Sequence, residues 1–188
     1  MPESSTQNFN HLKIHSQYSI CEGAIKIDDL QDFSKSNKIK SLGLCDTSNL
    51  CGALEFAEKI SKVGTQPIIG TQINFKYGDC IGLLPLFALN EEGYKRIIKL
   101  SSISFLENDE LSDPHVDFKD LLDDNTGVAV FSGTIFGLFG KLFNKGKFLS
   151  LIHTDAADER SSVDLGGRRI IKKGSCNWFK LGLKKFFA

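Results

Sequence analysis

Three polar side chains near the start of the chain have the spacing of a metal-binding strand. His11, Lys13 and His15 alternate with apolar residues, a pattern typical of a short strand, which we expect over residues 10–16. Residues two apart on a strand face the same side, so these three share a face. A row of imidazoles gathers metal ligands, but a protonated lysine neither ligates a metal ion nor tolerates one nearby. The stretch therefore has the form of a metal site whose central ligand is missing.

Two acidic residues are candidate members of the same site. Glu22 follows the row closely, and Asp46 ends the apolar stretch 41–45, which we expect to be a buried strand. In α/β folds chemistry collects where strands end, which favours Asp46 over most other acids. A partly buried lysine must be paired or lose its proton, so we expect an ion pair from Lys13 to Asp46 or Glu22. Lys13→Ala should then cost about 1–3 kcal/mol.

Neighbouring residues of interest have structural explanations. We expect His11 to be a hydrogen-bonded structural histidine rather than a ligand. Cys45 and Cys51 form no CxxC pair and are expected to be small core residues. Five cysteines, an odd number without an export signal, indicate reduced thiols in the cytoplasm. A phenylalanine run is expected to pack in the core; it comprises Phe131, Phe136, Phe139 and Phe143.

Composition limits the function classes. The 188 residues are enough for one ordinary core. Lysine plus arginine equals aspartate plus glutamate, 23 each, so no net basic field indicates nucleic-acid binding. The apolar runs are short and broken, which predicts no membrane span, and the first residues lack the basic and apolar regions of a signal peptide.

Strand and helix patterns alternate along most of the chain, as in an α/β fold with a largely parallel sheet, open or barrel-like. Pro85 predicts an edge or an irregular place in its strand, and Ser48 or Asn49 is expected to cap the second helix. The expected strands are 10–16, 41–45, 67–75, 81–89 and 128–131, and the expected helices are 27–36, 49–63, 91–106, 118–122 and 135–143.

The alternation stops at about residue 149, and residues 149–188 read as an atypical basic tail. A basic amphipathic helix near its end would suit a nucleic-acid or membrane-surface arm. The competing interpretation is an accidental or disordered sequence from a frameshift or truncated gene. We expect its removal to leave the rest folded.

Five segments, taken in order, resemble the N-terminal PHP (polymerase and histidinol phosphatase) domain of the bacterial DNA polymerase III alpha subunit. The resemblance covers residues 8–148 and implies a PHP-type partial or distorted (β/α) barrel with largely parallel strands, incomplete because the chain is truncated. The segments are HLKIHSQYS followed by Glu22-Gly23, LCDTSNLCG, QPIIGTQ, FALNEEGY and FSG.

The resemblance implies a metal site that has degenerated. The vestigial ligands are His15, Glu22 and Asp46, and the lost ligand positions are Lys13, Thr47, Gln72, Leu83 and Thr134. We therefore expect no catalytic residue and no cofactor; the alternative is a single residual zinc or manganese ion.

The function implied is a scaffold in DNA replication. Such a domain would support the remainder of the polymerase III alpha subunit and the proofreading exonuclease subunit in the cytoplasm. The parent family is a DNA-directed DNA polymerase, a nucleotidyltransferase, but this chain is expected to have no polymerase activity alone, to meet DNA only through the full-length polymerase and to bind no membrane. The alternatives are a stand-alone, metal-dependent phosphoesterase of the PHP superfamily and a truncated, poorly folding product.

Overall fold

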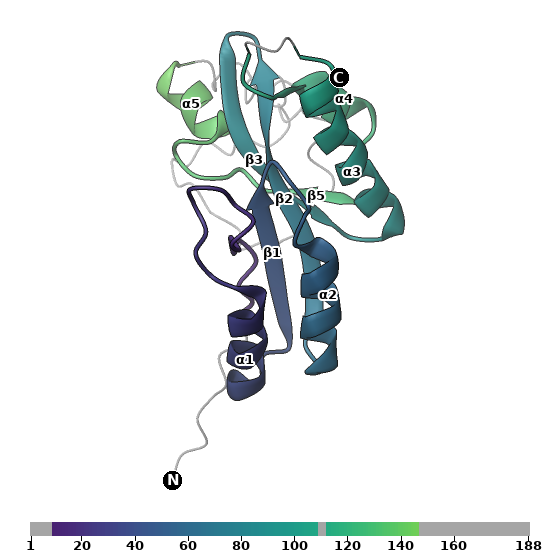
Figure 1. Cartoon of the computed structure of the whole chain (residues 1–188). Helices are drawn as coiled ribbons and strands as arrows, with labels where there is room; N and C mark the ends of the chain where they lie inside the picture. Colours follow the sequence, from purple (N-terminus) through teal and green to yellow (C-terminus); the bar gives the residue numbers. More distant parts are fainter. Residues whose placement is uncertain (1–8, 109–111, 147–188) are drawn as a thin grey trace, which may run out of the picture.

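A twisted, mixed β-sheet is the centre of the molecule (Figure 1). The computed structural model describes residues 9–108 and 112–146. Figure 1 shows α2, α3 and α4 to the right of the sheet, with α5 and the segment before α1 to its left. The elements in order are α1 (Ile27–Asn37), β1 (Ser41–Thr47), α2 (Ala53–Lys62), β2 (Gln66–Tyr77), β3 (Cys80–Ala88), α3 (Glu91–Leu106), β4 (Val116–Asp117), α4 (Phe118–Asp123), β5 (Val128–Val130) and α5 (Leu138–Asn144).

The sheet order is β1-β2-β3-β5, with β4 also paired to β2. β1 and β4 run parallel to β2, whereas β3 is antiparallel to both β2 and β5. The predicted α/β class is confirmed, and the open sheet agrees with a partial barrel. The antiparallel β2–β3 hairpin arises because only a two-residue turn at Gly78 and Asp79 joins these strands, and a parallel pair needs a much longer crossover.

The expected first strand is wrong as a regular element. Residues 9–15 have no assigned helix or strand, although their backbone follows β1. The Gly43 amide donates to the His11 carbonyl (2.7 Å) and the Cys45 amide donates to the Ile14 carbonyl (2.8 Å). The segment is thus an irregular edge of the sheet, and these two hydrogen bonds still fix the positions of Lys13 and His15 along β1.

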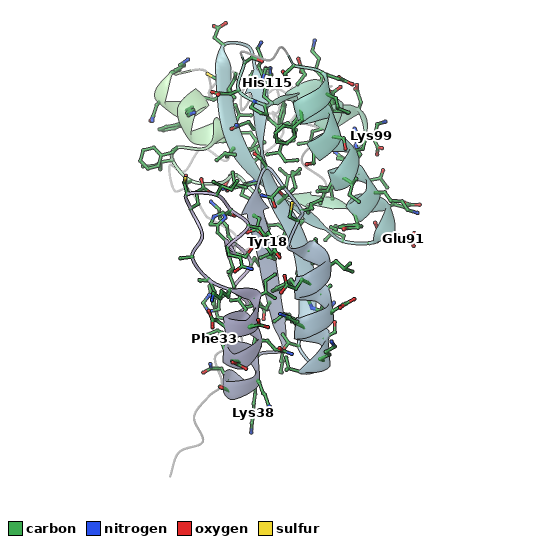
Figure 2. All side chains as sticks on the ribbon, in the orientation of Figure 1. Tyr18, Phe33, Lys38, Glu91, Lys99 and His115 are labelled. Atoms are coloured by element: carbon green, nitrogen blue, oxygen red, sulfur yellow. The ribbon has the colours of Figure 1, made fainter. Side chains whose placement is uncertain are left out.

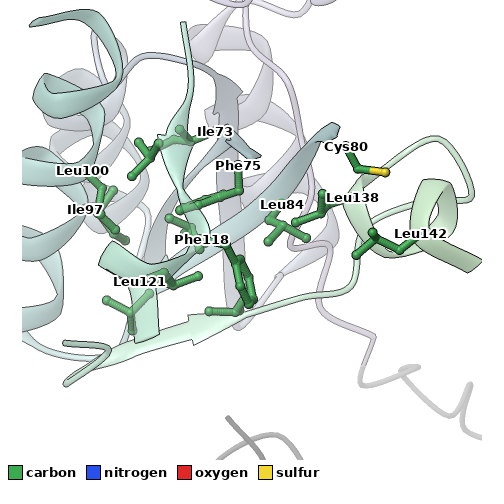
Figure 3. Close-up of a cluster of buried hydrophobic side chains, with 14 residues drawn as sticks. Ile73, Phe75, Cys80, Leu84, Ile97, Leu100, Phe118, Leu121, Leu138 and Leu142 are labelled. Carbon is green, nitrogen blue, oxygen red and sulfur yellow. The ribbon is translucent and has the colours of Figure 1, made fainter. Parts of the chain in front are cut away.

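Two apolar clusters form the core. The larger one joins the two long strands β2 and β3 to α3, α4 and α5, and Figure 3 shows Phe75 and Phe118 near its centre. The smaller one packs α1, β1 and α2 through Ile27, Leu44 and Phe56. Every described helix and strand contributes buried residues to a cluster, and Ile14 and Tyr18 of the 9–25 segment pack against the smaller one.

Helix α3 has the predicted bounds, and α1 differs from its prediction by one residue. The second helix does not have the predicted cap: its N-cap is Gly52, with no side-chain cap hydrogen bond. Asn49 instead donates to the carbonyls of Tyr18 and Thr47, both at 2.9 Å. A Cβ on Gly52 would lie 2.7 Å from the Tyr18 ring, so close approach of that ring requires glycine.

Pro85 lies in β3 at the place where pairing with β5 ends. Pairing of the two strands covers Leu86 to Ala88, and the next contact is a hydrogen bond from the Phe131 amide to the Pro85 carbonyl (2.9 Å). Proline has no N–H to return a bond to the Phe131 carbonyl, so regular pairing with β5 stops at Pro85, the predicted irregular place.

The phenylalanine run was wrongly predicted to be core. Phe131 is 39% exposed, Phe136 77% and Phe143 66%, whereas Phe139 packs against the larger cluster. The physical reason is that α5 begins only at Leu138, so residues 131–136 form a turn and Leu138 and Leu142 supply the buried face of the helix.

Cysteine burial separates two classes of thiol. Cys45 and Cys80 are buried, whereas Cys21 and Cys51 are exposed, so the prediction of a core position holds for Cys45 and is wrong for Cys51. Cys51 lies in the turn before α2, where its side chain faces solvent. Burial raises the pKa of the Cys45 thiol to about 12.

Thiol labelling tests this difference. At pH 8 a disulfide reagent should modify Cys21 and Cys51 in the native chain, and Cys45 only after unfolding, because the thiolate is the reactive form. Raising the pH to about 9 should not accelerate the labelling of Cys45, because the pKa of this thiol in the folded chain lies well above that value. Peptide mapping by mass spectrometry measures each site. Labelling of native Cys45 as fast as Cys51 would contradict the buried position.

None of the helices within residues 9–108 and 112–146 has both the length and the apolar character needed to cross a bilayer. The predicted domain boundary at residue 148, the basic tail 149–188 and its amphipathic helix lie outside the described residues. They remain predictions.

Candidate functional site

A pocket of about 390 Å³ opens between the 9–25 segment, the β2–β3 hairpin and the turn after β5. Most of the predicted ligand positions meet there, although they lie up to 121 residues apart in the chain. Its walls are formed by Lys13, His15, Glu22, Gln72, Leu83, Pro85, Gly133, Thr134, Phe136 and Gly137.

Six of the eight positions expected at the degenerate metal site line this pocket, and the other two lie directly behind it. The lining positions are Lys13, His15, Glu22, Gln72, Leu83 and Thr134. Thr47 and Asp46 complete the set from β1. The sheet explains the convergence, because Thr47 and Gln72 are paired across β1 and β2, and Gln72 is paired with Pro85 across β2 and β3.

Asp46 lies within β1 rather than after its end, and it is 1% exposed. Its Oδ1 accepts hydrogen bonds from the Ser16 amide (2.6 Å) and the Ser19 hydroxyl (2.7 Å). Its Oδ2 accepts one from the Ser16 hydroxyl (2.7 Å). A buried carboxylate needs such donors to compensate for lost hydration. Both oxygens of Asp46 are therefore already occupied by protein.

Glu22 is hydrogen-bonded from the sheet side. The Thr47 hydroxyl donates to Glu22 Oε2, and Gln72 Nε2 lies 3.4 Å from the same oxygen. Gln72 Nε2 also donates to Thr47 Oγ1 at 2.6 Å. The three positions thus form one chain of hydrogen bonds, in which Thr47 and Gln72 stand where the resemblance expects metal ligands.

His15 and Gln72 each carry a buried polar atom without a hydrogen-bond partner among the described residues. These atoms are His15 Nδ1 and Gln72 Oε1. His15 Nδ1 is 4.0 Å from Glu22 Oε2, beyond hydrogen-bonding distance, although a protonated ring would be attracted to this carboxylate. The vestigial ligand pair His15 and Glu22 is consequently close in space but not bonded.

The predicted ion pair of Lys13 is wrong. Lys13 is exposed and makes no ion pair with any carboxylate in the described part of the chain. The two candidate partners, Asp46 and Glu22, accept hydrogen bonds from hydroxyl and backbone amide donors instead. Lys13→Ala is accordingly expected to change stability by no more than about 0.5 kcal/mol, as at other surface positions.

The hydrogen-bonded structural role expected for His11 is also wrong for its ring. His11 is exposed, and its ring makes an edge contact with Phe9 at a centroid distance of 4.7 Å. Only its backbone carbonyl is bonded to the sheet. The irregular course of residues 9–15 turns the ring away from the pocket lining.

The donor set does not fit a metal cluster. Within the described ranges, no three His, Cys, Asp or Glu side chains are grouped so that they could hold an ion. Asp46 would have to release its serine donors before it could coordinate, and Lys13 adds a positive charge to the pocket wall. The polar side chains at the pocket are hydrogen-bonded to one another and are not arranged as metal ligands.

The role of Ser16 and Ser19 as hydrogen-bond donors to Asp46 was not predicted from the sequence. Both are buried, at 0% and 1% exposure, and both donate to Asp46. Their three-residue spacing directly after the His15 position was the available signal, but nothing local indicates an acceptor 27 to 30 residues away.

Tyr18 joins the same segment to α2, as Figure 2 shows near the middle of the molecule. Its hydroxyl donates to Glu55 Oε2 at 2.8 Å. This hydrogen bond to a carboxylate raises the pKa of Tyr18. The segment is therefore attached by side chains to α2 as well as to β1.

Comparison with known proteins gives a consistent result. The family model described as "PHP domain" matches residues 11–163. The DNA polymerase III subunit alpha of Rickettsia felis is 40% identical over 134 residues, covering 71% of this chain and 11% of that protein. The protein of the same name from Caulobacter vibrioides is 35% identical over 160 residues, covering 78% and 14%.

The chain therefore spans 11% to 14% of the length of these two relatives. Among solved structures, an amidohydrolase from Chromobacterium violaceum matches with a TM-score of 0.42 and 17% identity, covering 50% of this chain and 32% of that one.

Proposed function

The chain belongs to the PHP domain family, and on that basis we propose that it is a non-catalytic scaffold domain of a DNA polymerase III alpha subunit. The similarity to the alpha subunits supports this role in DNA replication. One observation carries the non-catalytic part of the proposal: the family's ligand positions converge on one pocket, but Asp46 and Glu22 there accept hydrogen bonds from Ser16, Ser19 and Thr47.

The proposed partners are the remainder of the alpha subunit and the proofreading exonuclease subunit, in the cytoplasm. The relatives are seven to nine times longer than the matched part, by the shares of 14% and 11%, so a domain of this kind has a large polypeptide to support. The chain has equal numbers of basic and acidic residues, so it has no net positive charge to attract DNA. Contact with DNA is proposed only through the full-length polymerase.

A metal-dependent phosphoesterase is the second candidate. The pocket itself favours it, because His15 and Glu22 remain on one wall. The absence of a third suitable ligand among the described residues weighs against it, since catalytic metal sites usually have three protein ligands.

The proposal predicts a chain without stoichiometric metal. After dialysis, elemental analysis should find well below one zinc, manganese or iron ion per chain. Lys13→His adds an imidazole to the same wall but leaves Thr47, Gln72 and Leu83 unchanged, so this variant should also remain metal-poor. Two or more ions per wild-type chain would contradict the scaffold proposal and favour the phosphoesterase.

A binding experiment tests the scaffold role directly. The full chain is mixed with an alpha subunit lacking its own PHP domain, and separately with the exonuclease subunit, and each mixture is analysed by size-exclusion chromatography. We expect co-elution with both. Failure to associate with either partner, together with hydrolysis of bis(p-nitrophenyl) phosphate that EDTA abolishes, would overturn the proposal.

A further inference from the structure

The loop 16–25 has no regular secondary structure, and only Ser16 and Ser19 in it are buried. Its backbone contact with the rest of the molecule is small: the Gln17 amide donates to the Ile25 carbonyl (2.9 Å) within the loop itself, at the isolated bridge between Ser16 and Ile25. The main-chain bonds to β1 end at Ile14. Side chains must therefore fix the loop against the sheet.

Asp46 supplies the first attachment. It accepts three hydrogen bonds, all from Ser16 and Ser19, at 2.6 to 2.7 Å. No described lysine, arginine or histidine forms an ion pair with it. Hydrogen bonds to an ionised acceptor are short and strong, so neutral donors alone compensate this buried charge.

Glu22, Thr47 and Gln72 supply the second attachment through their chain of hydrogen bonds. The two attachments are linked, because the Thr47 amide donates to Ser19 Oγ at 3.1 Å. Both ends of the loop are thus tied to adjacent residues of one strand, Asp46 and Thr47.

We infer that this network takes the place that a metal ion would have in holding the loop against β1 and β2. We call it the carboxylate clamp; its members are Ser16, Ser19, Glu22, Asp46, Thr47 and Gln72. Its acids keep the positions of ligands but act as hydrogen-bond acceptors. The clamp sets the orientation of His15 and Glu22 on the pocket wall, and it does not depend on the proposed role in replication.

Hydrogen exchange of the full chain tests the clamp. Asp46→Asn preserves size but removes the charge and one acceptor oxygen, so all three donors lose an ionised partner and at least one of them loses its acceptor. Amides of residues 16–22 should exchange on the order of tenfold faster or more, the factor expected from losing hydrogen bonds to a charged group. Amides of β2 and β3 that pair with each other should be unaffected. Asp32→Asn, at an exposed carboxylate of α1, is the matched control and should change neither region.

Adding and removing metal ions distinguishes a loop held by the carboxylate clamp from a loop held by a bound metal ion. EDTA should leave exchange of residues 16–22 in the wild type unchanged, and added Zn²⁺ or Mn²⁺ should not restore protection to Asp46→Asn. If Asp46→Asn fails to fold, Ser19→Ala, which removes one donor, should still raise exchange in the loop. Wild-type protection that EDTA abolishes, or unchanged exchange in both Asp46→Asn and Ser19→Ala, would overturn the clamp and leave the scaffold proposal standing.

Discussion

Replacing Phe75 with alanine is expected to lower the free energy of unfolding by about 3–5 kcal/mol, the usual cost of removing a buried phenylalanine ring. Phe75 is fully buried in β2, where the larger apolar cluster surrounds it. Its ring meets Phe118 edge to face at a centroid distance of 6.2 Å (Figure 3). The substitution removes both the buried area and this aromatic pair, and the rigid sheet cannot collapse to fill the space.

Phe136→Ala is the matched control for the same chemical change. Phe136 is 77% exposed in the turn after β5, so its truncation should alter stability by no more than about 0.5 kcal/mol. Urea denaturation followed by circular dichroism measures both variants. Equal losses in the two, or a loss below about 1 kcal/mol for Phe75→Ala, would contradict the position of the core.

Replacing Gly43 with alanine is expected to cost about 1–3 kcal/mol through overpacking. A Cβ at this position of β1 would lie 2.4 Å from the Leu12 carbonyl oxygen and 2.6 Å from the Leu12 Cα. Both are backbone atoms, which cannot rotate away, so the 9–15 segment must move from the sheet. Since Lys13 and His15 follow Leu12, one wall of the pocket moves with it.

Thermal melting and hydrogen exchange measure this effect together. Gly43→Ala should lower the melting temperature and raise exchange at the Cys45 amide, which donates to Ile14. Ser41→Ala, at a half-exposed position of the same strand, should do neither. An unchanged melt and unchanged exchange in Gly43→Ala would show that residues 9–15 do not lie against β1 as described.

The regular elements could be predicted because their signals are local. The bounds of α3 follow from its apolar period and from Asn90, whose side chain accepts from the Gly93 amide at the helix N-terminus. Strands β2 and β3 follow from two apolar runs, expected over 67–75 and 81–89, although their antiparallel pairing was not predicted. The resemblance also named positions far apart in the chain, most of which the structure brings to one pocket.

The error at Phe131 and Phe136 shows where local patterns fail. An apolar residue is buried only if its element presents it to the core. Because α5 begins at Leu138, the buried side chains of this helix are Leu138 and Leu142. No periodicity in a run of glycine and phenylalanine fixes that starting point.

The sequence by itself determined which polar groups are available near the pocket, among them Lys13, His15, Ser16, Ser19, Glu22 and Asp46. Only the tertiary structure decided their pairing. Lys13 was expected to pair with Asp46 or Glu22, but the loop 16–25 brings Ser16 and Ser19 to the Asp46 carboxylate, and Lys13 is exposed. Hydrogen bonds act over about 3 Å, so partners 27 to 30 residues apart are chosen by the path of the backbone and not by residue type.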